Sequence, residues 1–240
     1  MNLTNNKILI TGGGTGIGKG LAQLFHQLGN SVIICGRRKD VLKQVENELP
    51  GVISYSCDLL SENERESLMK KLETEHPDLN VLINNAGIQN WMKPEDSDFF
   101  ERAKMEIKIN VEAPVHLTQL FLAYRKAKTV INVSSGLAFT QLSNVPVYCS
   151  TKAFLHSYTR SMRHLLKSGN MEVIEIIPPA LNTDLGGIGL HDSAPAVSDF
   201  IEAVYQGLNA GKSEITWGFS EMMRNAGPVQ LEEAFNRMNP

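Results

Sequence analysis

Residues 7–20 read KILITGGGTGIGKG, and the fold of the chain can be worked out from this stretch outward. A short apolar run, KILIT, leads through a cluster of glycines into a helical pattern that ends near residue 29. Glycine adopts turn angles that other residues resist, so Gly12, Gly16 and Gly18 can form a tight turn between a strand and a helix. Glycines alone could make an ordinary turn, so the meaning of this one depends on the rest of the sequence.

The alternation of a short β-rich run and a longer helical stretch continues along the chain. Further β-rich runs, mostly of Val, Ile and Leu, predict strands at 31–36, 52–58, 80–87, 128–135, 172–179 and 213–218. Helices are expected at 38–49, 61–76, 146–167 and 196–211, with one or two more before Tyr124. Apolar strands that alternate with helices predict right-handed crossovers. The sequence therefore predicts an α/β fold, a doubly wound parallel sheet with helices on both faces, as a single domain of residues 1–240.

Composition agrees with a globular protein that binds neither nucleic acid nor membrane. Of the 240 residues, 42% are apolar and 20% charged, and the net charge of −3 gives no overall attraction for polyanions. The N-terminal residues show no signal-peptide pattern, and no apolar run is long enough to span a membrane. Three cysteines without a C-x-x-C pair suit a reducing compartment, so a cytoplasmic location is expected.

The position of the glycine-rich turn predicts a dinucleotide site. A turn that follows the first strand and opens the first helix lets backbone approach a pyrophosphate, and the helix N-terminus offers free N–H groups. An acidic residue at the end of the second strand would hold the ribose of NAD, but this chain has Gly36 followed by Arg37. A guanidinium binds a 2′-phosphate well, so Arg37 favours NADP(H), with NAD(H) still possible. Arg38 and Lys39 fit a solvated helix start.

Asp58, at the end of the third predicted strand, has two interpretations. Its carboxylate could accept a hydrogen bond from the adenine amino group of the cofactor. It could equally be a helix cap or an ordinary loop carboxylate.

Tyr148 and Lys152 lie four residues apart in a predicted helix and so share one of its faces. On an exposed face they would be an ordinary polar pair. A tyrosine that acts as a base near neutral pH must be acidified by about three pKa units, or ~4 kcal/mol. A cation about 4 Å away contributes ~4 kcal/mol at an effective dielectric constant near 20. In a desolvated cleft the spacing therefore predicts a proton-transfer pair in which Lys152 acidifies Tyr148.

Five motifs follow one another in order along the chain: TGGGTGIG, NNAG (84–87), Asn110 in KINVEAP, Ser135 in INVSSG, and YCSTK. In this combination the chain resembles the short-chain dehydrogenase/reductase family over essentially its whole length. Its ending and the segment IIPPALNTDL resemble the DltE-like subgroup. The resemblance implies a seven-stranded Rossmann sheet and NAD(P)-dependent oxidation or reduction at a carbonyl or alcohol carbon of a small molecule. It also implies a homodimer or homotetramer.

The resemblance implies a role for each matching residue. Tyr148 would be the general acid/base, Lys152 its activator and a ligand of the nicotinamide ribose, and Ser135 the partner of the substrate oxygen. Asn110 would hold a water of the proton relay. Further cofactor contacts would come from Ile17, Asn84, Ala86, Gly87 and Thr183. Substrate loops are expected near 88–96, 136–145 and 184–196. Pro179 departs from the Pro-Gly pattern of the family, and its fixed φ must stiffen that edge of the pocket.

A second class of function is a catalytically silent redox sensor or scaffold that binds NADP without turning it over. Such proteins on this fold usually lose the tyrosine or the lysine, and this chain keeps both. No histidine shows ligand spacing with cysteines or carboxylates, so no metal site is expected. Ser134 fits a strand-end hydrogen-bonding residue rather than a second catalytic serine. Residues 37–39 form a short basic cluster without a stacking motif, which argues against nucleic-acid binding.

Overall fold

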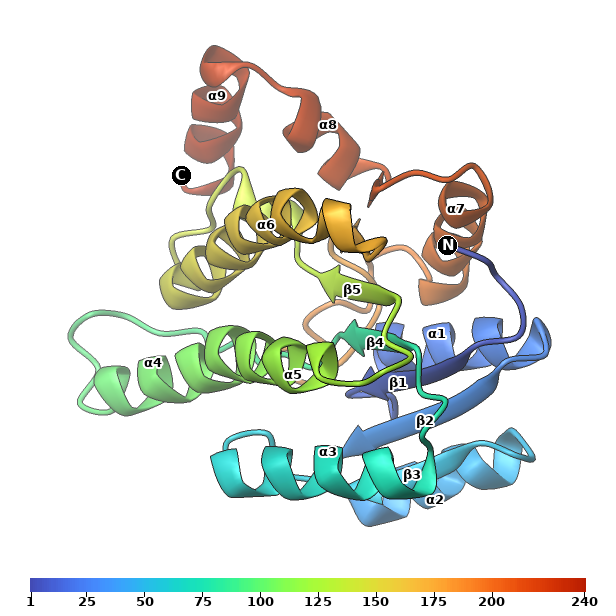
Figure 1. The fold of residues 1–240 in the computed structure, drawn as a ribbon. Coiled ribbons are helices and arrows are strands. Elements are labelled where there is room, and N and C mark those ends of the chain that lie inside the picture. The colour runs from blue at the N-terminus through green and yellow to red at the C-terminus, as the bar shows by residue number, and fades with distance from the viewer.

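All seven strands expected from the sequence are present in the computed structural model, which describes residues 1–240. They pair in parallel in the order β3-β2-β1-β4-β5-β6-β7, which confirms the predicted doubly wound sheet (Figure 1). The strands are β1 (Lys7–Thr11), β2 (Ser31–Gly36), β3 (Ile53–Ser56), β4 (Val81–Asn84), β5 (Thr129–Val133), β6 (Glu172–Ile177) and β7 (Glu214–Thr216). The strand order reverses between β1 and β4, and sheets of this kind bind ligands beyond the carboxyl ends of the strands at that point.

Helices connect the strands and cover the sheet (Figure 1). Three short segments of other helical type also occur: a π-helix η1 (Lys108–Glu112) and the 3₁₀ turns η2 (Gly136–Ala138) and η3 (Lys167–Gly169). The α-helices are α1 (Gly16–Gln27), α2 (Lys39–Glu48), α3 (Glu62–Glu75), α4 (Phe99–Ile107), α5 (Ala113–Leu122), α6 (Pro146–Leu166), α7 (Val197–Asn209), α8 (Phe219–Asn225) and α9 (Pro228–Met238). By length and apolar content, none of the helices qualifies as a membrane span.

The sheet is buried by two separate apolar layers. Helices α1, α2 and α7 pack Phe25, Val45 and Phe200 against one face of the strands. Helices α3 and α5 pack Leu72 and Phe121 against the other face. Burying each of these side chains contributes roughly 1.5–3 kcal/mol, so the apolar helix faces determine which side of the sheet each helix covers.

The edges of the sheet differ most from the sequence-based expectation. Strand β3 is shorter than the predicted 52–58, and its Ile53 is 41% exposed. Strand β7 contains only three residues. An edge strand pairs on one side only, so pairing and burial constrain its sequence less than that of a central strand. The C-terminal helices α8 and α9, which the strand and helix patterns did not predict, lie beyond α6 at the red end of the chain (Figure 1).

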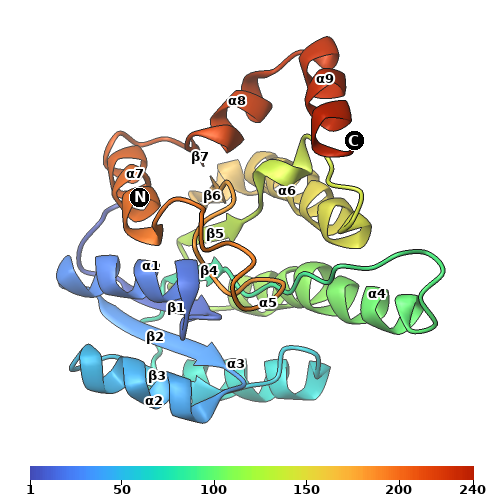
Figure 2. The ribbon, with the colours of Figure 1, turned by 180° about the vertical axis from the view of Figure 1, so that it is seen from behind.

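The loops that follow the strands are connected to one another at one end of the sheet. The segment between β6 and α7 passes beside the ends of β4 and β5 (Figure 2). A Cβ built on Gly16 would lie 3.2 Å from Thr183 Cγ2, so this segment also touches the start of α1. In the loops after β4 and β5, the Met92 N–H donates to the Asn144 carbonyl at 3.0 Å. These contacts bring together, at one end of the sheet, the loops on which the predicted site residues lie.

Candidate active site

The glycine-rich turn has the geometry of an anion cradle. Gly12 has φ +66°, a left-handed conformation that favours glycine, and its N–H donates to the Cys35 carbonyl at 2.8 Å. A Cβ on Gly18 would lie 2.2 Å from the Gly12 oxygen, which only a residue without a side chain avoids. Helix α1 begins directly after Thr15 with no side-chain cap and no acidic residue in its first turn. Its first N–H groups and its positive dipole end therefore fit a pyrophosphate.

Thr11 connects this turn to the NNAG segment after β4. Its hydroxyl oxygen accepts hydrogen bonds from the N–H groups of Asn85 and Ala86, both at 3.0 Å. Asn85 Nδ2 donates to the Thr11 carbonyl at 2.9 Å. Thr11 and Asn85 were not predicted as site residues, yet their hydrogen bonds hold the glycine-rich turn beside the next strand end.

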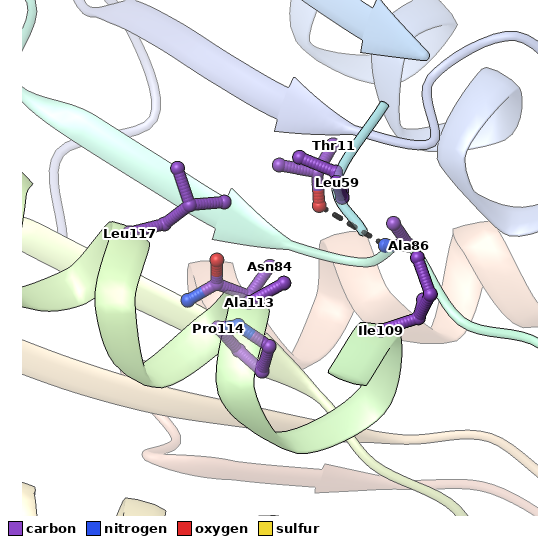
Figure 3. Close-up of a pocket in the computed structure, with 8 residues that line it drawn as sticks. All are labelled: Thr11, Leu59, Asn84, Ala86, Ile109, Ala113, Pro114 and Leu117. Atoms are coloured by element: carbon purple, nitrogen blue, oxygen red, sulfur yellow. Dashed lines mark hydrogen bonds between the residues drawn. The ribbon is translucent and has the colours of Figure 1, made fainter. Parts of the chain in front are cut away.

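The side chain of Asn84 makes its hydrogen bonds inside the fold, with a neighbouring strand and a covering helix. Its Nδ2 donates to Asn132 Oδ1 at 2.9 Å and to Thr118 Oγ1 at 3.1 Å, and Asn132 Nδ2 donates in turn to Thr159 Oγ1 at 2.8 Å. These bonds connect β4, β5, α5 and α6. Beside Asn84 lies a gap too narrow to hold a water molecule (Figure 3). Its walls are Thr11, Leu59, Asn84, Ala86, Ile109, Ala113, Pro114 and Leu117, and neither Tyr148 nor Lys152 lines it.

The residues assigned to the adenosine end of the cofactor lie on exposed or half-buried loops. Arg37 and Arg38 are both exposed at the end of β2. Arg38 Nη2 donates to Thr15 Oγ1 at 3.4 Å, so the arginine expected to be merely solvated is the one that contacts the glycine-rich turn. Asp58 Oδ1 accepts from the Leu60 N–H at 3.1 Å, which matches the loop-carboxylate interpretation.

The predicted catalytic side chains come together beyond the carboxyl end of β5. Tyr148 and Lys152 on α6 are 5% and 4% exposed, and Ser135, which follows β5, is 7% exposed. Lys152 Nζ lies 5.6 Å from the centre of the Tyr148 ring and donates to the Val133 carbonyl at 2.9 Å. The exposed-face interpretation of the Tyr-Lys pair is therefore excluded, because both side chains are buried.

Burial dominates the titration of both members of the Tyr-Lys pair. Burial raises the pKa of the Tyr148 phenol well above its usual range, and a hydrogen bond with Ser135 only partly opposes that rise. Burial also lowers the pKa of Lys152 to about 8. Acidification by Lys152 was expected for a full cation about 4 Å from the phenol oxygen, whereas the ammonium here donates to the Val133 carbonyl. Desolvation is therefore the largest influence on the pKa of the phenol in this arrangement.

Asn110 lies in η1, the π-helical segment between α4 and α5. Its Oδ1 accepts from the Ile88 N–H and its Nδ2 donates to the Ile88 carbonyl, both at 2.9 Å. A Cβ on Gly87 would lie 3.3 Å from Asn110 Oδ1 and 3.5 Å from Lys152 Nζ. Single π-helical turns often occur at functional sites, and this one places Asn110 against the loop after β4 and close to Lys152.

Two buried glutamates near the site were not predicted from the sequence. Glu175, in the middle of β6, is fully buried and contacts Ser134 and His156. Glu106 on α4 is also fully buried, accepts from the Asn90 N–H at 2.5 Å, and has its pKa raised to about 7 by burial. The charge inside the apolar run VIEII was the signal that could have revealed Glu175.

The fold places one histidine beside two glutamates from another helix. Ligand atoms of His116, Glu62 and Glu66 lie within 4.8 Å of one another, although His116 is about 50 residues from the two glutamates. Arg65 Nε donates to His116 Nδ1 at 3.1 Å, so a guanidinium already occupies one ring nitrogen of this exposed cluster.

Ser134, expected to be a strand-end hydrogen-bonding residue, does donate a hydrogen bond at the end of β5, to the carboxylate of Glu175.

With this geometry established, comparison with known proteins identifies the family. The family model described as short chain dehydrogenase matches residues 6–188. The chain belongs to the short-chain dehydrogenase family. An uncharacterized oxidoreductase DltE of Bacillus subtilis (strain 168) is 40% identical over 249 residues, which cover 100% of this chain and 98% of the relative. An uncharacterized oxidoreductase of Staphylococcus aureus (strain N315) is 30% identical over 75% of this chain and 80% of its own length.

Solved structures of other short-chain dehydrogenases share the fold. A short-chain dehydrogenase from Burkholderia cenocepacia, in complex with NADP, superposes with a TM-score of 0.84 at 22% identity and covers 98% of this chain and 99% of its own. The 3-ketoacyl-(acyl-carrier-protein) reductase from Brucella melitensis, complexed with NADH, has a TM-score of 0.79 at 23% identity and covers 91% of this chain and 100% of its own.

Proposed function

We propose that this short-chain dehydrogenase is an NADP(H)-dependent oxidoreductase that transfers hydride between the nicotinamide and a carbonyl or alcohol carbon of a small molecule. The observation that carries the proposal is the buried cluster of Tyr148, Lys152 and Ser135, which adjoins Asn110. A proton donor, a cation and a hydroxyl in one desolvated cluster are the groups that a carbonyl reduction needs. The NADP- and NADH-bound relatives of the same fold support the choice of cofactor.

Several residues fit the cofactor. The glycine-rich turn and the start of α1 would hold the pyrophosphate, because Gly12, Gly16 and Gly18 have no Cβ and the helix N-terminus has no side-chain cap. Arg37, together with Arg38, would bind the 2′-phosphate of NADP. Ile17, Ala86, Gly87 and Thr183 lie on the turn and the loops around it. The bound nicotinamide supplies the hydride, which no side chain can provide.

The side chains at the reacting end would handle the proton. Because burial holds Tyr148 as a neutral phenol, it is suited to give a proton to a carbonyl oxygen during reduction. Lys152, with a pKa of about 8, is mostly charged near pH 7 and would stabilise the phenolate left behind. Ser135 would donate a hydrogen bond to the same substrate oxygen.

The substrate would lie between the loops near 88–96, 136–145 and 184–196. Leu137, Leu142 and Leu185, which come from two of these loops, pack partly exposed against the buried cluster of Val145, Tyr148 and Cys149. An apolar wall beside a single polar reacting centre favours a small carbonyl compound or alcohol with an apolar substituent.

A turnover assay with matched tyrosine variants tests this function. NADPH oxidation would be followed at the nicotinamide absorbance with a panel of aldehydes, ketones and diketones. Tyr148→Phe should bind NADPH normally and lose turnover by roughly 10²–10⁴-fold, the usual contribution of general acid catalysis. Tyr158→Phe makes the same chemical change nearly three turns further along α6 and should keep full activity.

Unchanged turnover in Tyr148→Phe would refute the proposed acid. Firm NADPH binding without turnover of any compound in the panel would instead support the alternative, an NADP-binding sensor or scaffold.

A further inference from the structure

Helix α6 carries a third functional group on the face of Tyr148 and Lys152. His156 follows Lys152 at the same four-residue spacing, so the three side chains form a row along the helix. His156 Nδ1 lies 2.9 and 3.0 Å from the two carboxylate oxygens of Glu175 on β6. Ser134 Oγ donates to Glu175 Oε1 at 2.5 Å. The row of Tyr148, Lys152 and His156 on α6 thus ends against the hydrogen-bonded carboxylate of Glu175.

A carboxylate in the middle of a central strand is costly unless it is paired. Glu175 is fully buried, and His156 is the basic side chain within ion-pair distance of it. Glu214, which is in register with Glu175 on β7, is paired with both Arg163 and Arg224. The charge of Glu214 is therefore balanced within its own cluster, whereas that of Glu175 faces the catalytic helix.

Lys152 has no carboxylate within ion-pair distance and donates to the Val133 carbonyl. Burial lowers its pKa, and the charge of Glu175 acts in the opposite direction. Two of the other elements packed against α6, η1 and η2, present the neutral groups Asn110 and Ser135. Glu106 on α4 acts on Tyr148, whose pKa it raises. Lys152 Nζ binds the carbonyl of Val133, and Val133 lies between Asn132, the register partner of Glu175, and Ser134, which donates to Glu175. Glu175 is thus the carboxylate that the sheet places beside Lys152.

We propose that Glu175, held in place by His156 and Ser134, is a positioning residue that keeps Lys152 charged in its buried position. A buried lysine readily loses its proton, and a neutral Lys152 could no longer stabilise the phenolate of Tyr148. A fixed buried carboxylate opposes that loss without touching substrate or cofactor. The inference rests on the proposed function, because it assigns a role to Glu175 in the same proton transfer.

The titration of Lys152 tests the inference directly. The full-length protein would be labelled with ¹³C at lysine Cε, and the Lys152 resonance assigned by its absence in Lys152→Met. Glu175→Gln removes the charge but keeps the shape, and it should lower the midpoint of the Lys152 titration by about one pH unit. His156→Gln is the matched control, because it keeps an amide donor beside Glu175 and leaves the carboxylate charge in place. That variant should not lower the midpoint.

A catalytic readout should follow the same pattern. With the carbonyl compound that the wild type reduces fastest, Glu175→Gln should move the alkaline limb of the kcat profile down by about one pH unit, and His156→Gln should not move it down. If Glu175→Gln does not fold, Glu175→Met fills a similar volume without a polar atom and should give the same shift. An unchanged Lys152 midpoint without the carboxylate would overturn the inference. So would an equal lowering by His156→Gln, which would indicate a structural effect.

The outcome for Tyr148→Phe separates this inference from the proposed function. If Tyr148→Phe loses turnover but Lys152 titrates normally in Glu175→Gln, the role of Glu175 is wrong and the proposed function stands. If Tyr148→Phe keeps full turnover, the proposed acid is wrong, whatever Lys152 does.

Discussion

Replacing Gly18 by alanine should damage cofactor binding more than it damages the fold. The new Cβ would lie 2.2 Å from the Gly12 oxygen and 2.4 Å from Asn85 Nδ2, whereas real Cβ contacts begin near 3.0 Å. Since the Gly12 oxygen belongs to the backbone, α1 must move away from the glycine-rich turn by about 1 Å. Overpacking of this kind costs up to ~3 kcal/mol, and alanine returns ~1 kcal/mol of helix propensity. The net loss of ~2 kcal/mol corresponds to a Tm lower by ~4 °C for a chain of this length.

The same displacement moves the N–H groups at the start of α1 away from the pyrophosphate. Loss of one or two charge-assisted hydrogen bonds should weaken NADPH binding by roughly 30–100-fold. NADPH fluorescence titration and thermal unfolding measure the two effects. Gly169→Ala is the matched control, because a Cβ there meets nothing within 4 Å, and it should leave both the Kd and the Tm essentially unchanged. Wild-type affinity and Tm in Gly18→Ala would refute the close-approach reasoning.

Three further outcomes are expected. Arg37→Ala should weaken NADPH binding at least tenfold and NADH binding much less, as measured by fluorescence titration, and an equal loss for both cofactors would contradict a 2′-phosphate contact. Asn132→Leu removes the buried hydrogen bonds to Asn84 and Thr159 and should cost ~2–3 kcal/mol, seen in thermal melts as a Tm lower by ~4–6 °C. The pKa of Lys152 is about 8 in the folded protein and near 10.5 in the unfolded chain. Between pH 8 and 10.5 the unfolded chain therefore binds more protons, so the contribution of Lys152 to stability rises with pH in this range. Lys152→Met should therefore be more stable than the wild type at pH 7, by up to ~3 kcal/mol. The difference between the two unfolding free energies, measured with denaturant, should shrink between pH 8 and 10.5. A constant difference would argue against a charged, buried lysine.

Local patterns in the sequence were enough to predict the architecture and to select the side chains that the fold then buries together at the candidate site. The apolar strand runs, the glycine-rich turn after β1 and the four-residue spacing of Tyr148 and Lys152 depend on neighbours in the chain. The edges of the sheet were predicted less well, because β3 and β7 are only partly buried and their short polar sequences carry little periodicity. Helices α8 and α9 follow the last strand, so the alternation of strands and helices did not predict them.

Only the tertiary structure decided the electrostatics of the site. The direction of the Tyr148 pKa depends on how completely the phenol is buried, and spacing along a helix contains no information on burial. The contact of Arg38 with Thr15 and the pairing of Glu175 with His156 join segments 23 and 19 residues apart. Sequence periodicity specifies which face of an element is apolar, because that depends on residues three, four or two positions away. Which charges meet on that face depends on distances through space, which exist only once the sheet has formed.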